Sequence, residues 1–255
     1  MFNQWVKFPN NFEELNTLRL RFYEEHNFPG VIGCVDCTHI AIFPPKRNDP
    51  EYPEHIYVNR KGYHSINTQL ICDTNLKIMS VNALYPGSTN DAFIWSNSNV
   101  YNFLRTLHGL GHTDYYLLGD SGYPLRTWLL TPLEQEPVIN TPEYQYNQTH
   151  KSTRCLIERC NGVLKMRFRC LLKHRALHYA PEVASQIINA CVALHNLCIE
   201  HNVPVPDDDE GEVNFGLLDV GAADYTMNVG VVNPELTAGR RARQRLIQNY
   251  FNNRQ

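Results

Sequence analysis

The sequence predicts an α/β protein in which helices flank a mixed β-sheet. Two observations support this fold class. Apolar runs typical of strands occur at 30–45, 65–73, 77–85 and 115–118. The first three follow one another, whereas the later strands alternate with helical patterns. Consecutive strands followed by alternation are typical of a sheet with both antiparallel and parallel pairs.

The first 45 residues supply a helix and the opening strand. Apolar side chains at helical spacing predict a helix over 11–25 within an N-terminal helical lead-in, 1–29. The strand at 30–45 stops at Pro44 and Pro45 and carries one carboxylate, Asp36, in its middle. A lone charge in a core strand is unfavourable unless it is paired or coordinated. Asp36 therefore needs a partner elsewhere in the chain.

The middle of the chain alternates strands with helical segments. The strands at 65–73 and 77–85 should form a hairpin, with a turn at Asp73-Thr74-Asn75. The loop at 86–91 offers N-cap residues for a helix over 92–107. The strand at 115–118 ends in a Gly-Asp-Ser-Gly turn, and a turn of helix near 125–130 and a strand at 137–140 should follow.

The last hundred residues read as helical. Helices are predicted from about residue 149 and over 181–198, where Pro181 stands in the first turn. We expect one α/β domain over 30–200, an acidic, Pro-containing linker over 201–234 and a basic amphipathic helix over 235–255.

Composition excludes several classes of protein. The chain has 255 residues, 43% of them hydrophobic, so it can build a sizeable core and global disorder is excluded. It has no run of 18 apolar residues and no signal pattern at its start, so we expect a soluble, intracellular protein with no membrane attachment. The eight cysteines should be reduced and mostly buried.

Four acids occupy positions that need an explanation. Asp91 precedes a predicted helix and Asp120 follows a predicted strand, and ligand sites in α/β sheets gather at such ends. Taken alone, Asp91 reads more readily as a helix cap, Asp120 reads equally well as a turn residue, and Glu158 could be an ordinary solvated acid. Asp36 has no comparable alternative, because it stands in mid-strand.

Glu158 stands in a strongly basic segment. Residues 151–175 contain eight Lys or Arg residues and no other acid. Arg154 and Lys165 share the helical face of Glu158. A basic face that keeps one carboxylate suits a phosphate polyanion approaching a metal site, and a merely solvated basic helix is the less favoured alternative.

Divalent metal ions would account for these acids together. Mg²⁺ and Mn²⁺ prefer hard oxygen ligands, and two such ions can clamp both oxygens of a phosphoryl displacement. Carboxylates crowded together without cations would raise each other's pKa. The sequence therefore predicts a Mg²⁺ or Mn²⁺ site.

Five segments resemble the PIF/Harbinger-type DDE transposases and the Harbinger transposase-derived nuclease family. They are GCVDCTHI (33–40), YPGSTND (85–91), LLGDSGYP (117–124), ERCNGVLKMRF (158–168) and ACVALHN (190–196), in the family's order. The resemblance covers roughly 28–200. It implies an RNase H-like fold, a DDE nuclease domain, catalytic Asp36, Asp120 and Glu158, and Asp91 as a further metal ligand or a residue beside the ligands.

The chain departs from that family pattern in two places. Cys37 stands where the family usually has Gly. The family normally has an N-terminal helix-turn-helix region, but only about 30 residues precede the first strand here. We therefore expect a fragment, or a chain whose DNA targeting comes from a Myb-like DNA-binding partner. The resemblance also implies location in the nucleus, with the cytoplasm as a second compartment.

Other possible constellations are less favoured. Cys34 and Cys37 form a single CxxC with no second pair, and in a strand they point to opposite faces, which argues against a zinc site. His39 and His195 read as histidines with structural partners. Ser121 lacks the Gly-x-Ser-x-Gly context of a nucleophile.

The leading hypothesis is a metal-dependent endonuclease that hydrolyses DNA phosphodiester bonds. Asp36, Asp120 and Glu158 would hold the ions, with Asp91 beside them. The DNA backbone would be bound by five basic residues of the second half of the chain: Arg154, Arg159, Lys165, Arg167 and Arg169. The alternative is a catalytically silent, domesticated transposase that acts as a DNA- or protein-binding adaptor. A carboxylate-pair glycosidase is disfavoured by the basic helix.

Overall fold

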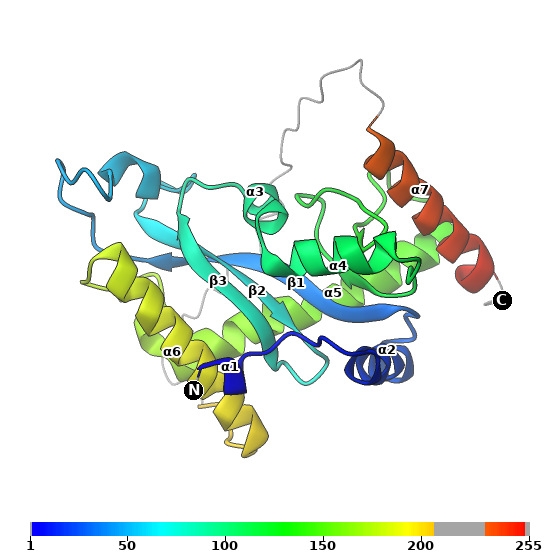
Figure 1. Ribbon diagram of the computed structural model, residues 1–255, viewed down its shortest axis with the longest axis horizontal. Helices are drawn as coiled ribbons and strands as arrows, with labels where there is room; N and C mark the ends of the chain where they lie inside the picture. The colour runs from blue at the N-terminus through cyan, green and yellow to red at the C-terminus, as the bar shows by residue number, and fades with distance from the viewer. Residues whose placement is uncertain (1, 207–232, 253–255) are drawn as a thin grey trace.

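The sheet has five strands in the order β3-β2-β1-β4-β5 (Figure 1). The computed structural model describes residues 2–206 and 233–252. The strands are β1 (Val31–Ala41), β2 (Ser65–Cys72), β3 (Ile78–Pro86), β4 (Tyr116–Leu118) and β5 (Leu129–Leu130). Neighbours among β1, β2 and β3 are antiparallel, whereas β4 runs parallel to β1 and to β5. This mixed sheet between helices confirms the predicted α/β, RNase H-like fold.

The β2–β3 hairpin forms where the sequence predicts it. The Asp73 carboxylate accepts hydrogen bonds from the backbone N–H groups of Asn75 and Lys77, both at 2.9 Å, and so closes the turn. Every residue of β2 is buried, as expected for a strand covered on both faces. In β1 the buried pattern is interrupted from Asp36 to His39, and these residues are half-buried. The central strand therefore opens to solvent at Asp36.

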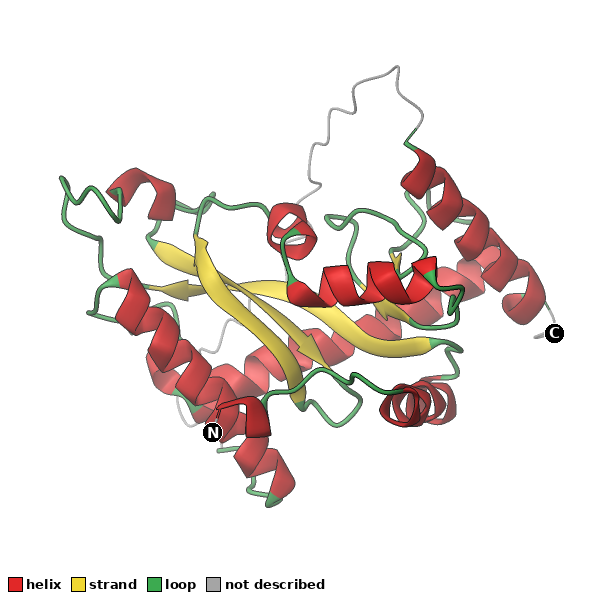
Figure 2. Ribbon diagram, viewed as in Figure 1, coloured by secondary structure: helices red, strands yellow, loops and turns green. Residues whose placement is uncertain are grey.

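Helices cover both faces of the sheet (Figure 2). Behind it lies α5 (Pro142–Arg167), with α6 (Pro181–Glu200) packed against α5 and β3, and in front lie α3 (Asp91–Ser96) and α4 (Asn99–Gly109). The side chains of β1 reach both resulting cores: Cys34 and Ile40 pack toward α5, and Val35 packs toward α4. Ile32 also belongs to the α4 core, because the register shifts between Val31 and Gly33 and breaks the alternation there. The remaining N-terminal helices and 3₁₀ turns are α1 (Phe2–Trp5), α2 (Phe12–His26), η1 (Glu54–Tyr57) and η2 (Arg169–Leu171).

Helix α6 is long and apolar enough to cross a membrane, judged by length and composition alone. It packs against β3 and α1, and its Ile188 and Val192 are fully buried in the core. Core helices of soluble proteins pass the same test. The absence of a membrane attachment stays a prediction.

Two of the predicted short elements are wrong. Residues 125–130 do not form a helical turn; Leu129 and Leu130 pair with Leu117 and Leu118 as β5. A two-residue strand is too short to show a period in the sequence. Residues 137–140 form no strand, and Val138 and Ile139 are 76% and 68% exposed, with no partner strand to cover them.

Two helix boundaries also differ from the prediction. The helix expected over 92–107 is broken into α3 and α4, because the Ser98 hydroxyl accepts from the N–H of Tyr101 and starts a new helix. Helix α5 begins at Pro142, earlier than expected, with Thr141 as its N-cap. The early start adds Tyr146, which is fully buried, to the core.

The C-terminal helix α7 (Pro234–Leu246) and its last turn η3 (Ile247–Phe251) pack onto the sheet domain. Phe251 is buried against Phe28 and Tyr146, with ring centroids 5.5 Å and 5.7 Å away. Arg243 donates to the carbonyls of Thr131 and Pro132. Most of the predicted linker, 207–232, and the end of the predicted basic helix, 253–255, lie outside the described residues.

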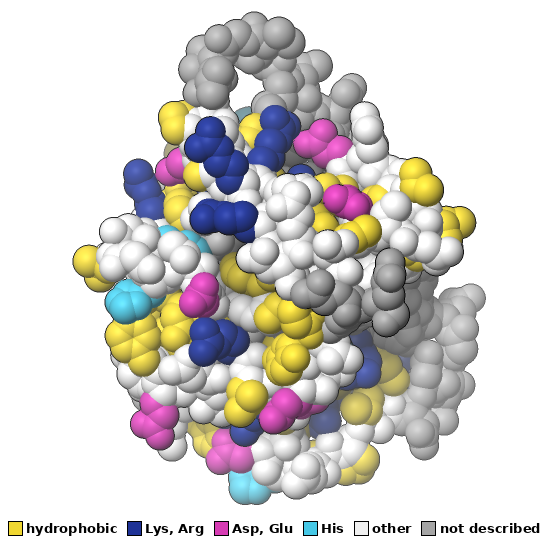
Figure 3. Space-filling model, turned by 90° about the vertical axis from the view of Figure 1, so that its right-hand side faces the viewer, with side chains coloured by type: hydrophobic (Ala, Val, Ile, Leu, Met, Phe, Trp, Pro, Cys, Tyr) yellow, Lys and Arg dark blue, Asp and Glu magenta, His cyan; other side chains and the backbone are white. Residues whose placement is uncertain are grey.

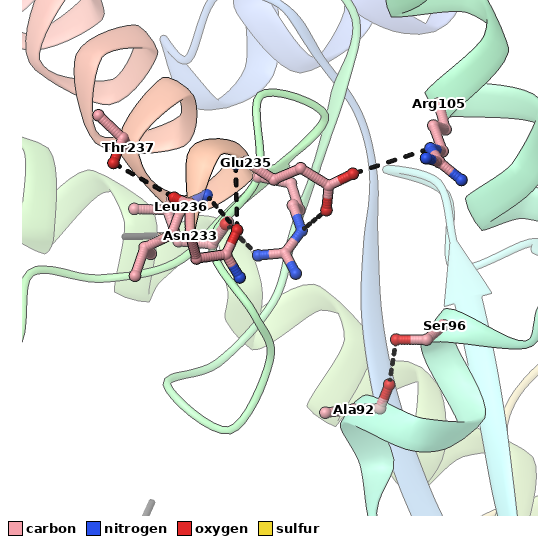
Figure 4. A network of polar contacts seen from close by, with 9 residues as sticks. Ala92, Ser96, Arg105, Asn233, Glu235, Leu236 and Thr237 are labelled. Carbon is pink, nitrogen blue, oxygen red and sulfur yellow. Dashed lines mark hydrogen bonds and ion pairs between the residues drawn. The ribbon is translucent and has the colours of Figure 1, made fainter. Parts of the chain in front are cut away.

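Charge pairs hold the start of α7 (Figure 4). Glu235 lies 2.9 Å from Nε of Arg126 and 3.8 Å from Nε of Arg105 on α4. Figure 3 shows the end of the molecule that carries α7, where basic side chains are interspersed with acidic and hydrophobic ones. The predicted basic helix is present over its described residues, and its acid Glu235 and its Arg243 attach it to the domain.

Candidate active site

Asp36 lies on β1, and Asp120 lies two residues beyond the end of β4, the parallel neighbour of β1. Cys34 of β1 is in register with Leu118 of β4, so Asp36 and Asp120, each two residues further on, come side by side. Both side chains are half-buried. Burial, and next the charge of Asp120, raise the pKa of Asp36 to about 7. The two carboxylates therefore share one site.

Asp120 is also a turn residue. Its Oδ1 accepts from the N–H of Gly122 at 2.9 Å, and a Cβ on Gly122 would lie 3.1 Å from that oxygen. Glycine thus lets the turn close tightly on the carboxylate. The two interpretations of Asp120, as a turn residue and as a site residue, are compatible, because the turn fixes the position of Asp120 beside Asp36.

Helix α5 places Arg154 and Glu158 over the same face of β1. The thiol of Cys34 donates to the carbonyl of Thr153, which fixes this crossing. Arg154 Nη2 donates to Glu158 Oε1. Burial lowers the pKa of Arg154, but Asp36, Glu158 and Asp120 outweigh it, and the pKa lies above its usual value. One guanidinium therefore lies among three carboxylates.

Asp91 lies on the opposite face of β1, the face of Cys37. Its Oδ1 accepts from Asn67 Nδ2 at 2.7 Å, and Cys37 hydrogen-bonds to it as well. Burial raises the pKa of Asp91, Asn67 lowers it and Asp120 raises it. Asn90, not Asp91, caps α3 through the N–H of Ala92. The cap interpretation of Asp91 is therefore wrong.

The donor chemistry at this site fits a divalent ion. Asp36 and Asp120 offer hard oxygen ligands, and their mutual repulsion is the kind that a cation removes. Within residues 2–206 and 233–252, no group of three or more His, Cys, Asp or Glu side chains is yet gathered closely enough to hold a metal ion. Glu158 turns toward Arg154, so it would have to leave this partner to become a third ligand.

The five predicted DNA-contacting residues separate in the structure. Arg154 and Lys165 lie with the carboxylates. Lys165 Nζ donates to Thr38 Oγ1 at 2.6 Å, and burial lowers its pKa to about 8 despite the opposing charge of Asp36.

The other three lie away from this pair. Arg159 is exposed and lies near His26, whose pKa is lowered by burial and, to a lesser degree, by Arg159. Arg167 donates to the carbonyl of Val203, and Arg169 belongs to η2. Their role toward DNA stays a prediction.

Several polar contacts around the site were not foreseen. Cys37 Sγ lies 3.3 Å from the hydroxyl of Tyr123, which gives a partner to the residue that replaces the family's Gly. His39 Nδ1 lies 3.0 Å from Ser65 Oγ, to which Asn59 Nδ2 also donates. Contacts between residues this far apart leave no periodic signal in the sequence.

Two of the structural interpretations are confirmed. Cys34 faces α5 and Cys37 faces Tyr123, so the CxxC pair does not converge. His195 is fully buried, and its Nε2 donates to the carbonyl of Leu76 at 2.9 Å.

A family model described as "DDE superfamily endonuclease" matches residues 35–196, more than half of the chain. The chain belongs to this family. The matched range contains Asp36, Asp91, Asp120 and Glu158, and their role as the acids of the DDE site stays a prediction. No solved structure matches the chain significantly.

Some curated relatives of this DDE chain carry a nuclease name. It is 41% identical over 205 residues to a human protein named "Putative nuclease HARBI1", covering 80% of this chain and 56% of that protein. It is 42% identical over the same length to the protein of that name from Rattus norvegicus, with the same coverage. "Protein ALP1-like" from Arabidopsis thaliana is 27% identical over 207 residues, 76% of this chain and 49% of that protein. The chain thus spans about half the length of these relatives. Its identity to the HARBI1 proteins confirms the Harbinger resemblance.

Proposed function

We propose that the chain is a divalent-metal-dependent endonuclease that hydrolyses DNA phosphodiester bonds. One observation carries the proposal: Asp36 of β1 and Asp120 just beyond β4 lie side by side, with Glu158 and Arg154 above them on α5. Membership of the DDE superfamily endonucleases supports the class of reaction.

Each residue of the site has a separate role in this proposal. Asp36 and Asp120, joined by Glu158, would hold Mg²⁺ or Mn²⁺, which polarises the phosphate and activates a water. Arg154 compensates the carboxylates and offers a guanidinium to a phosphate oxygen. Lys165, held on Thr38, adds positive charge on the same face. Asn67 fixes Asp91 on the opposite face.

Nicking of supercoiled plasmid DNA tests the proposal. The wild-type chain should nick DNA in Mg²⁺ or Mn²⁺ and not in EDTA. Asp120→Asn keeps the side-chain shape but removes the charge, so it should lose at least about a hundredfold in rate, as when a group stabilising the transition state is removed. Asp114→Asn, an exposed Asp four residues before Leu118, is the matched control. Equal nicking by wild type and Asp120→Asn would refute the proposal.

A second function, that of a catalytically silent adaptor, is favoured by one observation. Glu158 pairs with Arg154, and the acids in the described part of the chain are not gathered into a metal cluster. An adaptor would bind DNA or a Myb-like partner protein and nick no DNA in any divalent metal. Calorimetric titration with Mn²⁺ separates the two functions further. Only the nuclease requires a bound ion, and Asp120→Asn should weaken the binding of that ion.

A further inference from the structure

A short basic tip lies beside the candidate active site, formed by residues 59–64 between η1 and β2. Val58 and His64 form an antiparallel bridge, and the N–H of Asn59 donates to the carbonyl of Tyr63 at 3.0 Å. The N–H of Gly62 donates to the carbonyl of Asn59 at 2.9 Å, and Gly62 has a φ of +77° that favours glycine. This tight turn presents Arg60 and Lys61, both exposed.

Buried polar contacts fix the tip to the strand that carries Asp36. Asn59 is 4% exposed, and its Oδ1 accepts from the N–H of Lys61 at 2.9 Å. Its Nδ2 donates to Ser65 Oγ, which also contacts His39 of β1. A Cβ at Gly87 would lie 2.3 Å from Ser65 Oγ, so the loop leading to Asp91 closes directly on this network. The position of the tip relative to the carboxylates is therefore set before any ligand arrives.

The charges around the tip are arranged for an anion. Arg60 lies close enough to Asp91 for its charge to lower the pKa of that carboxyl, against the larger effect of burial. Lys61 lies close enough to Lys165 for its charge to lower the pKa of that amine. From another segment, Lys173 Nζ lies 4.8 Å from the ring centroid of Tyr63 in the tip. The acid Glu54 lies at the base of the tip, 3.3 Å from His64. Cations held near one another repel in the absence of a polyanion.

We propose that the basic tip, together with Lys173, binds the phosphate backbone of DNA where the strand enters the candidate active site. This inference rests on the proposed nuclease function, because it names the surface along which that substrate is bound. Exposed Arg and Lys on a rigid turn bind backbone phosphates without reading sequence. Because the tip is fixed in advance, little ordering opposes binding.

Equilibrium binding to a fluorescent DNA duplex, in EDTA so that no cleavage occurs, tests the tip. Arg60→Ala/Lys61→Ala should weaken binding alike for duplexes of unrelated sequence. It should also reduce the slope of log K against log salt by about 2, because each phosphate contact contributes about 0.9. Lys173→Ala should reduce the slope by about 1.

The matched control is Arg21→Ala/Lys77→Ala. It removes two basic residues that lie around Asp73, at the opposite end of β2, and should leave the slope unchanged. Circular dichroism and urea unfolding establish that each variant is folded. A folded tip variant with the affinity and slope of the wild type would overturn the inference.

The failure of this inference is distinguishable from that of the nuclease proposal. If Asp120→Asn abolishes nicking while the tip variant binds DNA normally, the nuclease stands and the tip does not bind the backbone. If the wild type nicks no DNA but the slope of log K against log salt is smaller for the tip variant than for the wild type, the nuclease proposal fails and the tip is confirmed as a DNA contact.

Discussion

At the scale of single residues, Arg154 provides the positive charge that balances the carboxylates of the site when no metal ion is bound. It pairs with Glu158 and lies within reach of Asp36 and Asp120, so it compensates charges that a metal ion would otherwise neutralise. The sequence could place Arg154 on the face of Glu158, because four residues separate them on a helix. It could not show that this face turns toward Asp36, because that depends on how α5 crosses β1.

Replacing Arg154 by Gln should make the stability of the protein depend on metal. Without an ion, the variant leaves the carboxylates uncompensated and should lose roughly 1–2 kcal/mol of unfolding free energy, reduced from the buried-pair value because both side chains remain partly exposed. Urea unfolding with and without Mn²⁺ measures this, and Mn²⁺ should restore most of the loss. An equal loss in both conditions would contradict compensation by Arg154.

His150 makes folding sensitive to acid. Burial lowers its pKa from the usual 6.5 to about 4, although its bond to the Leu130 carbonyl opposes this. The unfolded chain therefore binds more protons between these two values, and stability falls as pH decreases through that window. The contribution is on the order of 3 kcal/mol. Urea unfolding at several pH values should show a shallower decline for His150→Gln than for wild type, and no such change for the exposed His201→Gln.

At the scale of elements, the long and regular ones were predicted and the short ones were not. The β2–β3 hairpin has a turn signal and two apolar strands, and α6 has Pro181 at its start, so local sequence specifies them. Strand β5 exists only because Leu129 and Leu130 meet β4, which is tertiary information. The break at Ser98 could have been suspected, since Ser is a frequent N-cap, but the apolar period continues across it.

The side chain of Asn196 pairs with backbone groups on the outer edge of β3, where no further strand is present in the described sheet. Its side chain accepts from the N–H of Ile78 and donates to the carbonyls of Ile78 and Trp5, all within 2.7–2.8 Å. Asn196→Ala would leave buried backbone groups unpaired and should cost about 3 kcal/mol. Chemical denaturation should show this loss, whereas the exposed Asn249→Ala should be close to wild type. A near-neutral Asn196→Ala would mean that water replaces the amide.

At the scale of the whole molecule, the two ends of the described chain join one folded unit. The sequence separated a lead-in, a domain, a linker and a basic helix. In the structure, Phe28 from the N-terminal part and Phe251 from η3 share a cluster with Tyr146. Composition shifts indicate where a linker lies, but they carry no information on where the chain beyond it packs.

If α7 and η3 belong to this unit, truncating Phe251 should destabilise all of it. Phe251→Ala removes a fully buried ring and should cost about 3–5 kcal/mol. Calorimetry should show a single transition at lower temperature. A melting curve unchanged from wild type would mean that η3 is a separate appendage. Tyr179→Ala, which truncates an exposed aromatic side chain, is the matched control.

The central claim is that three of the four acids predicted from the sequence, Asp36, Asp120 and Glu158, form one metal centre. The sequence could identify Asp36 as anomalous, and the fold brings Asp120 beside it and Arg154 and Glu158 over it. X-ray diffraction of crystals soaked in Mn²⁺ tests this most directly, through the anomalous signal of the ion. We predict a Mn²⁺ peak bound by Asp36 and Asp120, with Glu158 released from Arg154. A structure in which Mn²⁺ binds elsewhere, or in which Arg154 still holds Glu158 and no peak lies between Asp36 and Asp120, would contradict the account.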